Sequence, residues 1–140
     1  MVMAMKESNG VGLAAPQVGD SRRIIVAEPR AGAEEPIELY KMINPEIYYR
    51  SEEMIACEEG CLSVPRFLLS VPRNATISVR WWTPEKTLEH QVFAGFPSIV
   101  IQHEIDHLDG KLFIDYLGPI KRSVITRKMV KLKKVMFIKQ

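Results

Sequence analysis

Several segments of the first 95 residues alternate apolar and polar side chains, as strands with one buried face do. The clearest case is residues 76–82, where Ile77, Val79 and Trp81 alternate with polar neighbours. Pro45 should end one strand, because proline lacks the N–H group that a sheet ladder uses. We predict strands at residues 23–27, 38–44, 47–57, 76–82 and 88–94, the last two forming a hairpin.

Turn-forming residues separate these strands. Two glycines and a proline predict a shaped loop at residues 10–17, after a short opening helix over residues 1–9. Residues 28–36 form a polar loop, and residues 58–65 a turn between strands. The strands should therefore pair mostly antiparallel, through short connections.

The spacing of apolar residues changes after residue 95. Pro97 suits the first turn of a helix, and the apolar residues that follow predict a buried helix ending at Gly110. A short strand-like segment at 112–116 precedes a second helix at about 119–138, which carries an apolar stripe at Ile125, Met129, Leu132 and Met136. The pattern indicates one α+β domain over residues 1–140: mostly antiparallel sheets around the buried helix, with an amphipathic C-terminal helix.

Composition excludes several classes of protein. Hydrophobic residues make up 46% and charged residues 26% of the 140 positions, as in soluble globular domains. No apolar stretch is long enough to cross a bilayer, and no secretory leader opens the chain. Two cysteines do not form a disulfide scaffold. We expect a reducing, cytoplasmic location and no membrane partner.

Charge is distributed unevenly along the chain. Residues 1–120 carry a net charge of −6, whereas residues 121–140 carry eight basic residues, no acidic one and a net charge of +8. Two interpretations remain open: a solvated helix face, or a surface that meets an anionic partner.

The segment most informative about chemistry is H-E-x-x-H on the predicted buried helix. His103 and His107 are one turn apart, so both imidazoles can bind one metal ion. Glu104 can then act as general base towards a water that the metal activates. The alternative is a pair of histidines satisfied within a core.

A catalytic metal needs a further protein ligand. Cys61 is the best candidate, because a thiolate suits zinc or ferrous iron, and three protein ligands leave one position open. Cys57 competes with it and is more simply interpreted as a small buried hydrophobic residue.

Three segments together carry a family resemblance. Residues 10–17 match G-x-G-L-A-A-x-Q, residues 59–63 match E-G-C-x-S, and residues 102–110 match Q-H-E-x-D-H-L-x-G. The chain resembles the peptide deformylases, of a bacterial type with a shortened N-terminus, since only nine residues precede Gly10 where relatives usually carry a further helical segment. The resemblance implies a metal-dependent hydrolase that removes the formyl group from N-formylmethionine of new polypeptides and releases formate.

The resemblance also implies roles for individual residues. The metal would be one divalent ion, natively Fe(II), with Zn, Ni or Co able to occupy the site. Gln17, through its side-chain amide, and Leu62, through its backbone N–H, would bind the oxyanion. The expected site comprises metal ligands Cys61, His103 and His107; base Glu104; oxyanion donors Gln17 and Leu62; substrate-binding residues Val11, Gly12, Glu59, Gly60, Phe96, Ile99 and Val100; and supporting residues Asp106 and Arg73.

Several of these assignments have simpler alternatives. Four apolar residues expected to line a methionine pocket could equally be ordinary core: Val11, Phe96, Ile99 and Val100. Asp106 needs a partner on a buried helix, and the resemblance points to Arg73. Glu59 is a candidate to orient either His103 or the turn that contains Glu59. His90 is expected to have no role.

Partners and competing functions complete the expectations. The resemblance favours an N-formylmethionyl peptide substrate, ribosome association through the basic terminal helix, and a monomer, in the cytoplasm, an organelle or a virus-infected host cell. Another H-E-x-x-H amidase or peptidase is one alternative, and a non-catalytic ribosome-binding protein is another. The intact Glu104 and the segment containing Gln17 favour the deformylase.

Overall fold

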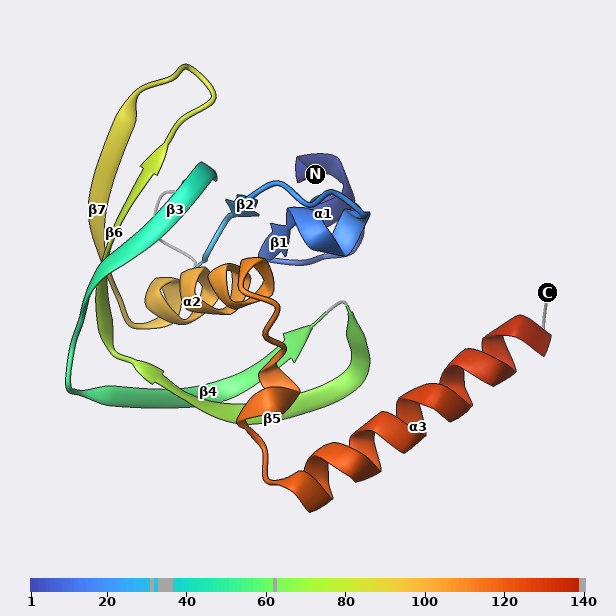
Figure 1. Ribbon diagram of the computed structural model, residues 1–140. Helices are drawn as coiled ribbons and strands as arrows, with labels where there is room; N and C mark the ends of the chain where they lie inside the picture. The colour runs from blue at the N-terminus through green and yellow to red at the C-terminus, as the bar shows by residue number, and fades with distance from the viewer. Residues whose placement is uncertain (31, 33–36, 62, 139–140) are drawn as a thin grey trace.

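One long antiparallel hairpin forms the frame of the protein and bends once to serve two sheets (Figure 1). The computed structural model describes residues 1–30, 32, 37–61 and 63–138. In it β3 (Tyr40–Arg50) pairs with β6 (Thr76–Trp82), and β4 (Met54–Cys61) pairs with β5 (Val64–Asn74). At the bend, the N–H of Ser51 donates to the carbonyl oxygen of Thr76 at 2.9 Å. This hydrogen bond continues the ladder between the two halves of the hairpin.

Three further strands complete the larger sheet. They are β1 (Gly12–Ala14), β2 (Ile24–Ala27) and β7 (Leu88–Ala94), and the strand order is β1-β2-β3-β6-β7. All of its pairings are antiparallel. In the described part of the chain, the smaller sheet consists of β4 and β5.

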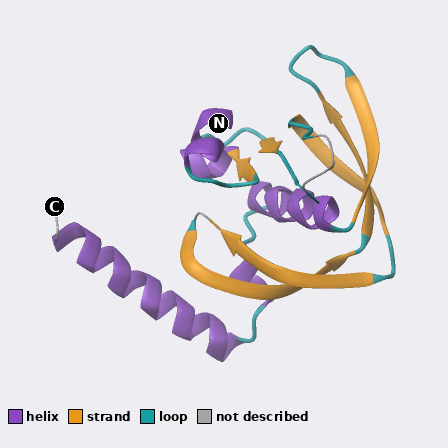
Figure 2. Ribbon diagram, turned by 180° about the vertical axis from the view of Figure 1, so that it is seen from behind, coloured by secondary structure: helices purple, strands orange, loops and turns teal. Residues whose placement is uncertain are grey.

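Helix α2 (Phe96–Leu108) lies between the large sheet and the β4–β5 hairpin, as Figures 1 and 2 both show. Its buried Val100, Ile101 and Ile105 pack on the inner face of the large sheet. Pro97 stands in its first turn, and Gly110, with a φ of 74°, follows its end in the left-handed region that glycine accepts without a Cβ clash. One helix is thereby held between two sheets.

The remaining helices lie at the edges of the molecule. Helix α1 (Val2–Glu7) covers β1, and two 3₁₀ helices, η1 (Ala15–Val18) and η2 (Phe113–Tyr116), follow β1 and α2. Helix α3 (Pro119–Ile138) leaves the body as an arm, anchored near its start by Ile125 (Figure 1). No helix in the described part of the chain is long and apolar enough to cross a membrane.

The α+β prediction is confirmed, and the predicted helices and the strands at 76–82 and 88–94 are present. The prediction that Pro45 ends a strand was wrong, because β3 continues to Arg50. Asn44 adopts a φ of 50°, and the pairing with β6 shifts register between Ile43 and Glu46. This bulge gives the proline a place where no ladder N–H is needed.

The predicted strand over 47–57 and turn over 58–65 were also wrong. The chain bends at residues 51–53, β4 runs to Cys61, and β5 occupies residues that carried no strand prediction. Pro72 argued against a strand in this segment, but an edge strand of a two-stranded sheet tolerates proline. Glu59, Gly60 and Cys61 therefore lie at the end of β4, and a strand holds its side chains more rigidly than a loop would.

The strand-like segment at 112–116 is the 3₁₀ helix η2 instead. The N–H of Leu112 donates to the Asp115 carboxylate at 2.8 Å, which closes the turn. Alternation over so few residues does not distinguish a strand from such a capped turn.

The packing of β6 side chains in the core can be tested by substitution. Ile77 is fully buried, whereas Val92 on the neighbouring strand is 60% exposed. We expect Ile77→Ala to lower the free energy of unfolding by about 2–5 kcal/mol, because it leaves a cavity. Val92→Ala should change it by less than about 0.5 kcal/mol. Urea unfolding of both variants measures the difference, and equal effects would contradict the packing.

Candidate metal centre

Helix α2 and the end of β4 bring three metal-binding side chains together. His103 and His107 stand one turn apart on α2, and their Nε2 atoms are 3.2 Å from each other. The Sγ atom of Cys61, the last residue of β4, is 3.4 Å from Nε2 of His107. The three ligand atoms all lie within 4.8 Å of one another, and all three side chains are largely buried.

These separations fit a single metal ion. Around tetrahedral zinc, nitrogen ligands at about 2.05 Å lie about 3.3 Å apart, and a sulfur and a nitrogen lie about 3.6 Å apart. Burial alone would raise the pKa of the Cys61 thiol, but hydrogen bonds with His103 and His107 outweigh burial and lower it to about 6. The thiol is thus prepared to be the thiolate that a metal requires.

Glu104 is buried beside these ligands with one oxygen unpartnered. Its Oε2 makes no hydrogen bond with the described residues, although the side chain is only 5% exposed. Burial raises the pKa of this carboxyl to about 7. A buried carboxylate oxygen without a donor is costly, so its retention points to a missing ligand or water at this place.

Gly12 provides the space that Glu104 occupies. A Cβ atom built on Gly12 would lie 2.5 Å from Oε1 of Glu104, closer than two such atoms can approach. Only glycine therefore lets β1 pass this close to α2. The backbone of β1 forms one wall of the site as a result.

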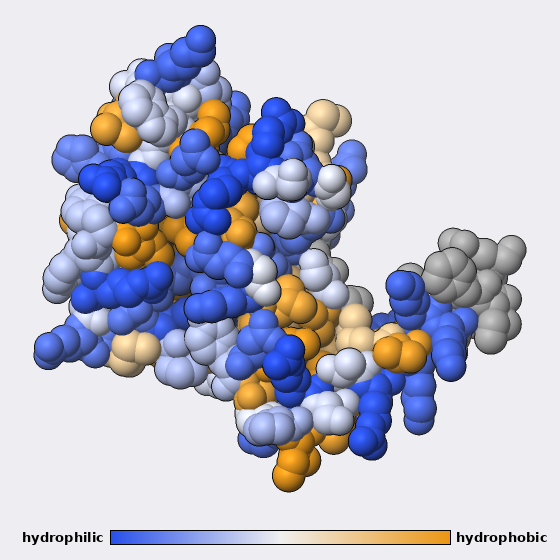
Figure 3. Space-filling model, in the orientation of Figure 1, coloured by the Kyte–Doolittle hydropathy of each residue, from blue (hydrophilic) through white to orange (hydrophobic). Residues whose placement is uncertain are grey.

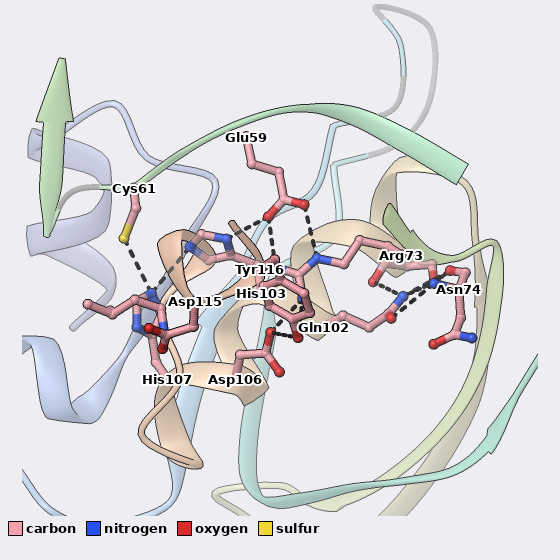
Figure 4. A network of polar contacts seen from close by, with 12 residues as sticks. Glu59, Cys61, Arg73, Asn74, Gln102, His103, Asp106, His107, Asp115 and Tyr116 are labelled. Carbon is pink, nitrogen blue, oxygen red and sulfur yellow. Dashed lines mark hydrogen bonds and ion pairs between the residues drawn. The ribbon is translucent and has the colours of Figure 1, made fainter. Parts of the chain in front are cut away.

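A second set of polar side chains holds His103 in place (Figure 4). Nδ1 of His103 is 2.8 Å from Oε1 of Glu59, and Arg73 donates to both oxygens of Glu59 at 2.9 Å. Burial alone would raise the pKa of Glu59, but these hydrogen bonds outweigh it and lower the pKa. The Glu59 carboxylate is thus ionised and orients the ring of His103.

Arg73 also donates to Asp106 on the other side, as the family resemblance implied. The hydroxyl of Tyr116 in η2 donates to the same Asp106 oxygen at 2.6 Å, and its ring lies 4.9 Å from the Arg73 guanidinium carbon. Sequence reasoning missed Tyr116, because it lies in the segment that was predicted as a strand. The apolar and aromatic residues after Gly110 gave no signal of a polar contact.

Gln17 reaches the centre from η1. Its Oε1 accepts a hydrogen bond from the N–H of Ala14 at 2.9 Å, so its amide nitrogen faces Sγ of Cys61 at 3.8 Å and Oγ of Ser63 at 3.1 Å. A side-chain donor is therefore directed at the ligand cluster. Leu62, the other expected oxyanion donor, lies outside the described residues.

Two cavities meet at the ligand cluster. The smaller, about 160 Å³, is lined by all four residues expected to form an apolar pocket, together with residues of β4 and the α2 residues His103 and Glu104. The larger, about 640 Å³, includes Gly12, Gln17 and Cys61. Val11, Gly60, His103 and Glu104 line both. A molecule that extends from one cavity into the other would pass beside His103 and Glu104.

Cys57 lines the small cavity, which the sequence did not indicate. It is two residues before Glu59 on β4, and it is half-buried rather than a core residue. The interpretation of Cys57 as a small hydrophobic residue buried in the core was therefore wrong, because its side chain lines a cavity instead. The continuous strand from Met54 to Cys61, which was not predicted, is what turns Cys57 to the site.

Known proteins match this chain over nearly its whole length. The family model described as polypeptide deformylase matches residues 1–123. A peptide deformylase of Bradyrhizobium sp. (strain BTAi1) is 42% identical over 134 residues, covering 94% of this chain and 77% of the relative. The chain belongs to the polypeptide deformylase family. It is a hydrolase that removes the N-formyl group from nascent polypeptides.

Solved deformylases share the fold. The crystal structure of peptide deformylase from Ehrlichia chaffeensis has a TM-score of 0.92 at 32% identity, covering 98% of this chain and 81% of that one. A Met-Ala-Ser-bound class I type b deformylase from Acinetobacter baumannii has a TM-score of 0.79 at 42% identity, covering 84% and 76%. The antiparallel sheets and C-terminal helix are those of deformylases.

The contact between Gly12 and Glu104 generates a prediction for this deformylase. Gly12→Ala should lower kcat/KM by about 100-fold, because the new methyl group displaces the carboxylate by about 1 Å. Gly118→Ala is the matched control, since a Cβ there meets no atom within 4 Å. Deformylation kinetics at equal metal content measure both. Wild-type turnover by Gly12→Ala would show that the position of Glu104 is not critical.

Proposed function

We propose that Cys61, His103 and His107 hold the catalytic metal of this deformylase, and that the native metal is Fe(II). One thiolate and two imidazoles suit ferrous iron and also accept zinc, cobalt or nickel. When bound, the metal supplies a Lewis acid that acidifies water and polarises the formyl oxygen. The donor set and its separations support this proposal.

Glu104 is the general base and then the general acid. Its carboxylate accepts a proton from the attacking water as the water oxygen adds to the formyl carbon. The same carboxyl then gives the proton to the amine nitrogen as the C–N bond breaks, so formate and a free amino terminus leave. The observation that carries this assignment is the buried, unpartnered Oε2 beside Cys61, His103 and His107, in a carboxyl whose pKa burial raises to about 7.

The oxyanion that forms on the formyl oxygen needs fixed donors. The amide nitrogen of Gln17 is one, because the Ala14 N–H holds the other end of that amide. The backbone N–H of Leu62 is proposed as the second. Each such donor is worth about 10²–10³ in turnover.

The peptide adds as an extended strand beside the metal. Gly12 and Gly60 offer backbone groups on opposite walls, and the methionine side chain enters the small apolar cavity. Its lining includes the apolar side chains Val11, Phe96, Ile99 and Val100, together with Glu59. The Met-Ala-Ser bound to the Acinetobacter relative supports a peptide of this kind as ligand.

Arg73 and Asp106 act through other residues. Arg73 fixes Glu59, and Glu59 fixes His103, whereas Asp106 completes the hydrogen bonding of Arg73. They are positioning residues, since they contact neither metal ligand atoms nor the cavities.

Glu104→Gln separates catalysis from metal binding. We expect it to retain a full complement of metal and to lose at least about 10²-fold in kcat, because an amide cannot accept the proton. The experiment measures formate release from formyl-Met-Ala-Ser by anaerobically prepared protein, with the metal content determined on the same samples. Iron should predominate in those samples.

Two results would contradict these assignments. Turnover by Glu104→Gln at the wild-type rate would remove Glu104 from catalysis. A Cys61→Ser variant that binds iron as tightly as the wild type would remove Cys61 from the ligand set.

Helix α3 is proposed to dock the enzyme on the ribosome, where nascent chains emerge. Residues 121–140 carry eight basic residues and no acidic one, and α3 stands clear of the body (Figure 3). Ribosomal RNA is the anionic partner that this charge fits. The enzyme would work there as a monomer in the cytoplasm, with all proposed site residues supplied by one chain.

Charge reversal on α3 tests this docking. Lys128→Glu with Lys131→Glu should weaken co-sedimentation with ribosomes by at least about tenfold at low salt, because two phosphate contacts are lost. Lys41→Glu with Lys86→Glu makes the same charge change on the large-sheet side and should have little effect. Equal losses in both pairs would indicate non-specific attraction and contradict docking through α3.

A further inference from the structure

In the binding mode proposed above, the formyl group lies where the two cavities meet and the methionine side chain fills the smaller one. The larger cavity then receives the part of the peptide that follows methionine. One wall of this larger cavity is Asn9 and Gly10, next to α1. The other is Arg66, Phe67 and Leu68 near the tip of the β4–β5 hairpin, which faces α1 and β1 across the cleft (Figure 1).

Among the described residues of Asn9, Gly10 and the 66–68 segment, which form these two walls, Arg66 is the charged one. Among the described residues that line the larger cavity, the other ionisable side chains belong to the metal centre: Cys61, His103 and Glu104. No carboxylate in the described part of the chain lies within 4.0 Å of the Arg66 guanidinium, unlike Arg22, Arg23, Arg30, Arg73, Arg80 and Arg122, which all form ion pairs. Its positive charge is available to a ligand.

The backbone holds Arg66 at this wall. Its φ is 70°, in the left-handed region that arginine seldom adopts, and β4 and β5 shift register between Glu59 and Cys61, directly opposite. The bulge that results lies beside Gly60, where a Cβ would meet the side chain of Leu68 at 3.3 Å. The Arg66 position is therefore coupled to the strand edge along which the peptide is proposed to lie.

We propose that Arg66 is a specificity-determining residue that favours substrates with an acidic side chain at the second or third residue, behind N-formylmethionine, and disfavours basic ones. This inference rests on the proposed function of the metal centre and the direction in which the peptide leaves it. An exposed ion pair of this kind changes binding by up to about fivefold. Because Arg66 attracts glutamate and repels lysine, kcat/KM should be about tenfold higher for a glutamate peptide than for the matching lysine peptide.

The test compares amide-capped peptides that differ only in charge. The substrates are formyl-Met-Xaa-Ala and formyl-Met-Ala-Xaa amides with glutamate, glutamine or lysine at Xaa. Their kcat/KM values are measured at about 0.01 M and about 1 M salt, where the screening length falls from about 30 Å to about 3 Å. The wild type should prefer glutamate over lysine by about tenfold in at least one series at low salt, and nearly lose that preference at high salt.

Two variants assign the preference to Arg66. Arg66→Gln should bring the ratio of glutamate to lysine close to one, and Arg66→Glu should invert it. Lys86→Gln is the matched control, because Lys86 is also exposed and left-handed, with a φ of 65°, but lies outside the cleft. It should keep the wild-type ratio.

The outcomes distinguish this inference from the function on which it rests. Turnover of all peptides at equal rates overturns the role of Arg66 and leaves the metal centre as proposed. A preference that survives in Arg66→Glu also overturns it. Failure of metal-loaded wild type to deformylate even the glutamine peptides contradicts the proposed function, and the role of Arg66 with it.

Discussion

The buried guanidinium of Arg73 joins the β4–β5 hairpin, helix α2 and η2 through its ion pairs and its contact with an aromatic ring. Arg73 is 3% exposed, and its charge is compensated by Glu59 from β4 and Asp106 from α2, with Tyr116 from η2 stacked on it. Removing one partner from such a buried pair costs about 3–5 kcal/mol. Because the partners come from three elements, satisfying Arg73 requires the hairpin, the central helix and η2 to assemble in one arrangement. That arrangement leaves Glu59 aimed at His103, so the same ion-pair network that stabilises the fold also orients a proposed metal ligand.

The candidate metal centre beside this network contains two features that lower the stability of the fold. Glu104 is buried with an oxygen unpartnered, and Gly12 leaves the space that its carboxylate needs. A core selected for stability alone would contain neither feature, since local rules are broken mainly at functional sites. The packing of Val100, Ile101 and Ile105 of α2 against the large sheet offsets this loss of folding free energy.

The arm and the body are joined at the same network. Tyr116 closes the contact with Asp106, and Asp115, its neighbour in η2, is paired with Arg122 of α3 at 2.8 Å. The base of α3 is thus attached to the segment that completes the metal-centre support. Net charge differs accordingly, with an acidic surplus in residues 1–120 and a basic surplus in residues 121–140.

Features that depend on local geometry could be predicted from the amino-acid sequence. Four-residue spacing places His103 and His107 on one helix face in any context, and the alternation at 76–82 specifies a strand for the same reason. Long-range pairing decided the rest. Pro45 and Pro72 argued against strands, until a bulge and an edge position accommodated them. Cys57, Arg66 and Tyr116 gained their positions only when β4 met β5 and η2 folded under α2. Which side chains face a site depends on strand register, and register is set by partners distant in the chain.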